Sequence, residues 1–157
     1  YKILDRVPSN IPTSWFYMLV ASLAICGRFL PAKDDNASKW WWAFMGGVVL
    51  TLWDVSMDPA MVKTNHWFWQ IGDLSDRSAF EQFIGKPIFF GMPITNWLGW
   101  LLTGIIVARV MLALVPPSVW AAKVSPHRLP ITLYAVNGLL PIAICLRQDM
   151  VLAGVLG

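Results

Sequence analysis

Four long apolar stretches alternate with short polar segments along the chain. Each reaches the length of roughly 17 residues that an α-helix needs to cross the hydrocarbon core of a bilayer. The pattern predicts membrane-spanning helices at about 14–30, 40–58, 93–115 and 130–146. A last apolar stretch, 150–157, is too short to cross and predicts a partial fifth helix. The expected fold is therefore all-α, an integral membrane bundle of four to five transmembrane helices.

Side chains at the ends of these stretches help to set the boundaries. Lys39 precedes Trp40, Trp41 and Trp42, a basic and aromatic sequence that is typical of a membrane interface. Pro93 suits the first turn of the third helix. Pro59 predicts the end of a helix or a kink, and Pro141 predicts a kink, because proline lacks the N–H that a helix needs.

Small residues predict where helices pack closely. Gly46 and Gly47 lie inside the second apolar stretch, and Gly104 and Ala108 lie four residues apart in the third. Small side chains allow two helix backbones to approach each other. We therefore expect neighbouring helices to pack against the second and third helices at these positions.

The composition agrees with a membrane location. Hydrophobic residues make up 57% of the 157 residues and charged residues only 13%, about half the share that soluble domains carry. The ten Trp residues also fit, because Trp is enriched at membrane interfaces. The length predicts one domain, residues 1–157. The Lys and Arg residues divide equally between the two faces of a four-helix arrangement, so they predict no orientation.

The positions of the charged residues, Cys and His argue against nucleic-acid binding and metal binding. The net charge of +3 comes from scattered residues with no run of Lys and Arg, so nucleic acid is not an expected partner. Cys26 and Cys145 lie in apolar stretches and form no CxxC pair. His66 and His127 fall on opposite faces of the predicted bundle. No metal site is therefore expected.

The stretch from Trp53 to Trp100 carries the chemistry. Asp54 and Asp58 are four residues apart, so they share one face of the second helix near its end. Asn96 lies at the start of the third helix. Consecutive spans joined by a loop have these ends on the same membrane face, so the three side chains are expected at one depth. Acids inside a membrane are costly and suggest a function by default.

Such a polar site suits the addition of water to the end of a long apolar molecule. A carboxylic acid that burial keeps neutral can donate a proton to a carbon–carbon double bond. Trp faces stabilise the resulting cation, and a second acid or an amide holds the attacking water. We assign Asp54 as the proton donor, with Asp58 and Asn96 managing water.

Simpler interpretations exist for each of these residues. Asp58 can be an idle, solvated helix end, and Asp54 can form a structural ion pair with Arg109 or Lys63. Asn96 can hold the start of its helix or bridge two helices by hydrogen bonds. The Trp residues serve mostly as interfacial and packing side chains.

The same residues resemble a known family. The sequence is similar to the membrane carotenoid hydratases, which act on γ-carotene-type and bacterioruberin-precursor end groups and are often described only as carotenoid biosynthesis proteins. The shared features are Asp54, Asp58-Pro59, the Trp67-Phe68-Trp69 segment and the 91–100 segment Gly-Met-Pro-Ile-Thr-Asn-Trp-Leu-Gly-Trp. The resemblance implies a lyase that adds water across a terminal carotenoid double bond, leaving a tertiary hydroxyl, with no cofactor.

The resemblance also implies which residues touch the substrate and what the partners are. We expect a carotenoid, as substrate or as bound pigment, and membrane lipid as the main partners, in an inner or photosynthetic membrane. The expected substrate-binding residues are aromatic side chains and one proline near the acids: Trp53, Trp67, Trp69, Pro93, Trp97 and Trp100.

Two other functions stay open. A non-catalytic pigment-binding or structural subunit of a larger membrane complex, for example a photosynthetic one, would also be small and rich in Trp. A transporter fragment that uses Asp54 as a proton site is a third interpretation. In the subunit interpretation, other membrane subunits are partners.

Overall fold

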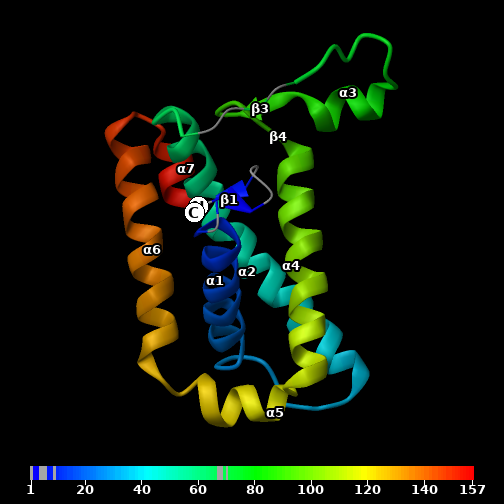
Figure 1. The fold of residues 1–157 in the computed structure, drawn as a ribbon, viewed down its shortest axis with the longest axis vertical. Helices are drawn as coiled ribbons and strands as arrows, with labels where there is room; N and C mark the ends of the chain where they lie inside the picture. Colours follow the sequence, from blue (N-terminus) through cyan, green and yellow to red (C-terminus); the bar gives the residue numbers. More distant parts are fainter. Residues whose placement is uncertain (1, 4–6, 9, 67–68, 70) are drawn as a thin grey trace. The chain divides into compact units, whose positions relative to one another are not determined.

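The structure is a computed structural model that describes residues 2–3, 7–8, 10–66, 69 and 71–157. Helices predominate, with two antiparallel strand pairs (Figure 1). The long helices are α1 (Asn10–Cys26), α2 (Asn36–Lys63), α4 (Ile94–Leu114) and α6 (Arg128–Arg147). The short ones are α3 (Ala79–Gly85), α5 (Pro117–Val119), the π-helix η1 (Trp120–Val124) and α7 (Val151–Leu156). Strand β1 (Lys2–Ile3) pairs with β2 (Val7–Pro8), and β3 (Pro87–Phe89) pairs with β4 (Met92–Pro93).

Each predicted long apolar stretch is a helix, with shifted ends. Helix α2 continues through Pro59 to Lys63, so Pro59 does not end the helix, and the expected kink stays a prediction. Pro59 is fully buried, and its packing compensates for the single helical hydrogen bond that it cannot donate. Pro93 was expected in the first turn of the third helix, but it lies in β4 and α4 begins at Ile94. Pairing with Pro87 holds Pro93 in extended backbone.

Helix α6 also passes through its proline, and a long-range contact accompanies it. Pro141 has no N–H to donate to the carbonyl four residues earlier, which belongs to Asn137. The Trp53 indole N–H donates to that carbonyl instead, with Nε1 3.2 Å from the oxygen. The indole therefore satisfies a backbone acceptor that the proline leaves without its usual helical donor.

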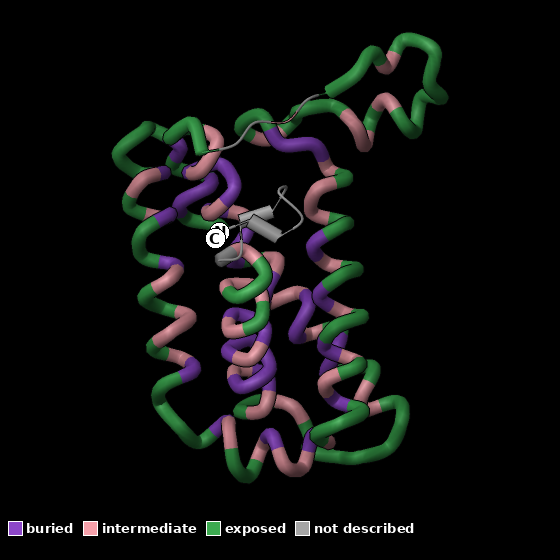
Figure 2. Tube along the Cα trace, in the orientation of Figure 1, coloured by how far each residue is buried: buried purple, intermediate pink, exposed green. Residues whose placement is uncertain are grey.

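Two helices in the described part of the chain are long and apolar enough to cross a membrane, α4 and α6. Only 22% of the most apolar window of each is buried inside the structure. Their surfaces are accordingly mostly exposed or half-buried (Figure 2). Helix α1 contributes a shorter apolar segment, Ile11–Cys26. Length and composition thus point to membrane association, and the full count of four to five spans stays a prediction.

Short helices lie within or next to two polar segments that connect the long helices. The 118–129 connection holds the end of α5 and all of η1. The charged 72–81 segment leads into α3, whose first turn is closed by a capping box between Ser78 and Glu81. Helices α3, α5 and η1 are all too short for an apolar repeat to predict them.

The chain forms two compact units: residues 1–50 with 104–135, and residues 51–103 with 136–157. The core of the first contains Met18, Leu23, Trp42 and Leu50, all fully buried. The second has a small cluster of Ala60, Cys145, Met150 and Ala153. The candidate site residues that the structure describes all belong to the second unit.

Close helix packing in the first unit confirms the role expected of the small residues. A Cβ atom added at Gly104 would lie 3.2 Å from both the Gly47 Cα and a Leu50 methyl. We expect Gly104→Ala to lower the free energy of unfolding by about 1 kcal/mol, because the Gly47 backbone cannot give way. Gly99 on the same helix has no such neighbour within 4 Å. Gly99→Ala should be neutral or stabilising by up to about 1 kcal/mol, and equal destabilisation of both variants in a denaturation titration would contradict this packing.

The loop before α2 is tied to α5 by a carboxylate. The Ser118 hydroxyl donates to Asp34 Oδ2 at 2.6 Å and the Ser118 N–H donates to Oδ1 at 3.0 Å. These bonds hold the pKa of Asp34 below its usual range. Their stabilising effect is present above the ordinary aspartate pKa and is lost as the pH falls through the lowered value.

Ser118→Ala should therefore raise the pKa of Asp34 toward that of an ordinary aspartate. A carboxyl-carbon NMR titration measures this value directly. The same pKa in the variant and in the unmodified chain would show that Ser118 has no influence on this carboxylate.

Candidate functional site

Two acids lie side by side on the last turns of α2. Asp54 and Asp58 are one helical turn apart, so both point to the same face. Asp54 is 0% exposed and Asp58 1% exposed, so neither is the solvated helix end that a simpler interpretation foresaw. Helix α2 continues past Pro59 to Lys63, so both acids lie within the helix rather than at its end.

Asn96, in the first turn of α4, joins the two acids. Its amide nitrogen donates to Asp58 Oδ2 at 2.5 Å and to Asp54 Oδ2 at 3.4 Å. The same nitrogen lies 3.4 Å from the Met92 sulfur. A tight turn between β3 and β4, in which Phe90 and Gly91 adopt φ of 49° and 90°, precedes this helix start. The three side chains predicted to meet are thus brought together, while their roles stay predictions.

The acid pair lacks a cationic partner. No Lys, Arg or His forms an ion pair with Asp54 or Asp58 within the part of the chain that the structure describes. The expected alternative partners lie elsewhere: Arg109 donates to Asn36 and covers the Trp40 ring, and Lys63 is exposed. Burying two unpaired negative charges is very costly. A carboxyl pair in such a place is stable when it shares a proton.

One oxygen of the pair is especially informative. Asp54 Oδ1 is buried and has no hydrogen-bond donor among the described side chains and backbone groups. The Asp54 and Asp58 carboxyls are close enough to form a hydrogen bond with each other when one of them carries a proton. The arrangement can therefore hold a proton and pass it between two acids.

Several of the predicted aromatic residues pack against other aromatic rings in the same unit as the acids. Trp53 and Trp100 are buried and meet edge to face, with ring centroids 5.9 Å apart. The Trp97 and Phe89 rings meet edge to face, with ring centroids 5.0 Å apart. Pro93 is buried in β4. Trp53 also has a structural role, because its indole N–H donates to the Asn137 carbonyl in α6. The sequence did not suggest this hydrogen bond.

Trp67 and Trp69 are the remaining aromatic residues of the predicted site. Trp69 is half-buried, and its indole nitrogen is buried without a hydrogen-bond acceptor among the described residues. Trp67 lies outside the residues that the structure describes. The expectation that both indoles bind the substrate therefore stays a prediction.

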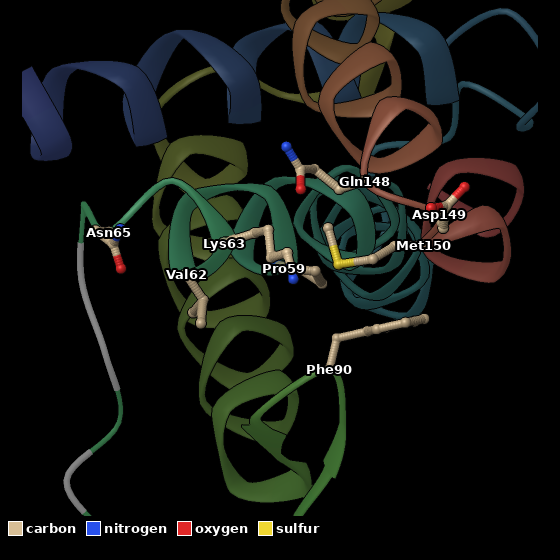
Figure 3. Close-up of a pocket in the computed structure, with 8 residues that line it drawn as sticks. All are labelled: Pro59, Val62, Lys63, Asn65, Phe90, Gln148, Asp149 and Met150. Atoms are coloured by element: carbon tan, nitrogen blue, oxygen red, sulfur yellow. The ribbon is translucent and has the colours of Figure 1, made fainter.

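A cavity of about 610 Å³ adjoins the acid-bearing turn (Figure 3). Pro59, which directly follows Asp58, forms part of its wall. The other lining residues come from the end of α2, the β3–β4 turn and the α6–α7 turn: Val62, Lys63, Asn65, Phe90, Gln148, Asp149 and Met150. Polar and apolar side chains both face this space, so it can admit water.

Unusual backbone conformations converge on this cavity. Asn65, Phe90 and Asp149 are the described non-glycine residues with positive φ, and all of them line it. Asn65 and Asp149 end α2 and α6 in the same way, each followed by an N–H that bonds back to the carbonyl five residues earlier. Strained conformations of this kind cluster at functional sites. This cavity could not be predicted from the sequence, because segments far apart in the chain build it.

A family model described as carotenoid biosynthesis protein matches residues 1–157. The chain belongs to the carotenoid biosynthesis protein family. No curated protein and no solved structure is similar enough to match the chain. The resemblance inferred from Asp54, Asp58 and the 91–100 segment is therefore to the right family.

The chemical groups of the site limit the reactions that it can support. Among the described residues, no group of three or more His, Cys, Asp and Glu is placed to hold a metal ion. The side chains that the site does offer are carboxyl, amide and indole groups. These can transfer protons, orient water and stabilise positive charge.

Proposed function

We propose that the chain is a carotenoid hydratase of the membrane, adding water to a terminal carbon–carbon double bond without a cofactor. The observation that carries this proposal is the pair of buried acids Asp54 and Asp58, which share the half-buried Asn96 amide as a donor and form no ion pair with a cation among the described residues. A family role in carotenoid biosynthesis supplies the substrate class. The proposal includes an integral membrane location with four to five spans and lipid as a neighbour.

In the first step, Asp54 gives its proton to the less substituted carbon of the double bond. The two π electrons form the new C–H bond and leave a tertiary cation on the neighbouring carbon. The Trp53 and Trp100 rings, which pack against each other near the acids, supply electron-rich faces for this cation. Burial strengthens this electrostatic stabilisation because the surroundings have a low dielectric constant.

In the second step, water adds to the cation. Asn96 and Asp58 hold the water, its oxygen forms the C–O bond, and Asp58 accepts the released proton. That proton returns to Asp54 through the hydrogen bond between the two carboxyls. The sum is one water added and an unchanged enzyme, so no oxidant or reductant is needed.

The cavity beside Pro59 is the proposed route for this water. Val62→Trp should fill part of it and lower the turnover number several-fold while leaving the Michaelis constant for the carotenoid unchanged, because the apolar substrate arrives from the lipid. Val107→Trp is the matched control. Val107 lies on α4 and is 38% exposed, so this variant should change neither constant. A rise in the Michaelis constant alone would instead place the substrate in this cavity.

A non-catalytic pigment-binding subunit is the second candidate. The large apolar surfaces of α4 and α6 favour it, since partner subunits could cover them as well as lipid. Expression in a carotenoid-producing host separates the two functions. The hydratase should yield carotenoids with the mass of one added water per modified end. A pigment-binding subunit would copurify with unmodified carotenoid and leave the pigment profile of the host unchanged.

A further inference from the structure

The first unit contains a second cavity, of about 550 Å³, that the proposed reaction does not use. Its walls come from α1, the end of η1 and the first turns of α6. Phe16, Val20 and Leu133 contribute apolar surface. Lys123 and Arg128, together with His127, contribute polar and basic side chains. We call this cavity the basic groove.

The basic end of the groove is held in place by backbone contacts. Arg28, just beyond the end of α1, donates to the carbonyl of His127 at 3.1 Å and to that of Pro126 at 3.5 Å. These bonds join the turn before α6 to α1 and add a further cation there. The π-helix η1, which carries Lys123, ends with Ser125 N–H donating to the Trp120 carbonyl at 2.9 Å. Short π-helical segments occur often at functional sites.

The basic side chains of the groove are exposed and have no acidic partner among the described residues. No acidic residue lines the groove, and no carboxylate forms an ion pair with Lys123, His127 or Arg128 in the part of the chain that the structure describes. Phe16 and Leu129 beside them are 59% and 67% exposed. A ligand that fits this surface therefore has a negative head and an apolar body.

We propose that the basic groove binds one anionic phospholipid. Its phosphate lies between Lys123 and Arg128, and an acyl chain lies along Phe16, Val20 and Leu133. Basic pockets between apolar helices bind anionic headgroups in this way. An uncharged carotenoid would leave the cations without a partner, and a soluble phosphate would leave the apolar wall uncovered. The proposal is independent of the hydratase function, because none of these residues belongs to the acid cluster.

Native mass spectrometry of the full chain in detergent tests this proposal. The chain is mixed with phosphatidylglycerol or phosphatidylcholine carrying identical acyl chains, and the bound fraction is measured. The unmodified chain should retain phosphatidylglycerol preferentially. The Lys123→Gln/Arg128→Gln double variant should bind it about 30-fold more weakly, since each basic side chain near a phosphate contributes about 1 kcal/mol.

Lys33→Gln/Lys39→Gln is the matched control, because it removes the same charge from the same unit outside the groove. It should keep the affinity of the unmodified chain. Val20→Trp, which fills the apolar part and keeps every charge, should also weaken binding. Equal retention of the two lipids, or equal losses in the groove and control variants, would overturn the proposal. Displacement of the lipid by inorganic phosphate alone would show a phosphate site rather than a lipid site.

Discussion

The Asp54→Asn variant should form at least about a hundredfold less hydrated carotenoid than the unmodified chain, because positioned acid catalysis contributes factors of about 10² to 10⁴. The substitution keeps the size and shape of the side chain and removes the acidic proton. In the proposed mechanism Asp58 holds the water and accepts its proton, so it does not replace the lost donor. Product formed in a carotenoid-producing host, separated by chromatography and identified by mass, measures the loss.

The control for this variant is the binding of unmodified carotenoid. Asp54→Asn should still copurify with carotenoid, because the aromatic residues that we propose as the substrate contacts are unchanged. Glu81→Gln, which alters an exposed acid in the α3 capping box, should keep full activity. If Asp54→Asn retained normal product formation, Asp54 would not be the proton donor.

The Asn96→Leu variant should lower the free energy of unfolding by about 2 kcal/mol, the cost of leaving a buried polar group without its hydrogen bond. In this structure one amide nitrogen serves both acids, so its loss removes two hydrogen bonds at once. Thr95→Leu is the matched control, because Thr95 is the preceding residue of α4 and is exposed. That variant should be within about 0.5 kcal/mol of the unmodified chain.

A double-mutant cycle separates this effect from a general disturbance of α4. In the background of Asp58→Leu, Asn96→Leu should cost less than half as much, because its main acceptor has been removed. Thermal or denaturant unfolding followed by circular dichroism gives all four values. Strict additivity of the two substitutions would mean that the Asn96–Asp58 hydrogen bond contributes no stability.

Much of the helical arrangement could be predicted because long apolar stretches have few alternatives to helix. The sequence predicted 93–115 where α4 spans Ile94–Leu114, and 130–146 where α6 spans Arg128–Arg147. The errors fell at prolines, where local preference competes with packing. Helix α2 continues past the buried Pro59, and pairing with Pro87 places Pro93 in β4. A rule that considers only neighbouring residues cannot anticipate such compensation.

The candidate site was predictable to a similar extent. The spacing of Asp54 and Asp58 fixes a shared helix face, and the loop between α2 and α4 requires their ends to lie on one side. What the sequence could not supply is the bidentate position of the Asn96 amide and the cavity next to Pro59. Both depend on the β3–β4 turn and on helix ends with positive φ, which arise from contacts between distant segments.

The most direct test uses the purified chain in lipid vesicles with a carotenoid that carries an unmodified terminal double bond. The reaction is run in water labelled with both heavy oxygen and deuterium, in the absence of any added cofactor. The hydratase mechanism predicts that each modified end acquires one heavy oxygen in its tertiary hydroxyl and one deuterium on the adjacent carbon. Carotenoid that stays bound but unlabelled, or a hydroxyl whose oxygen does not come from water, would contradict it.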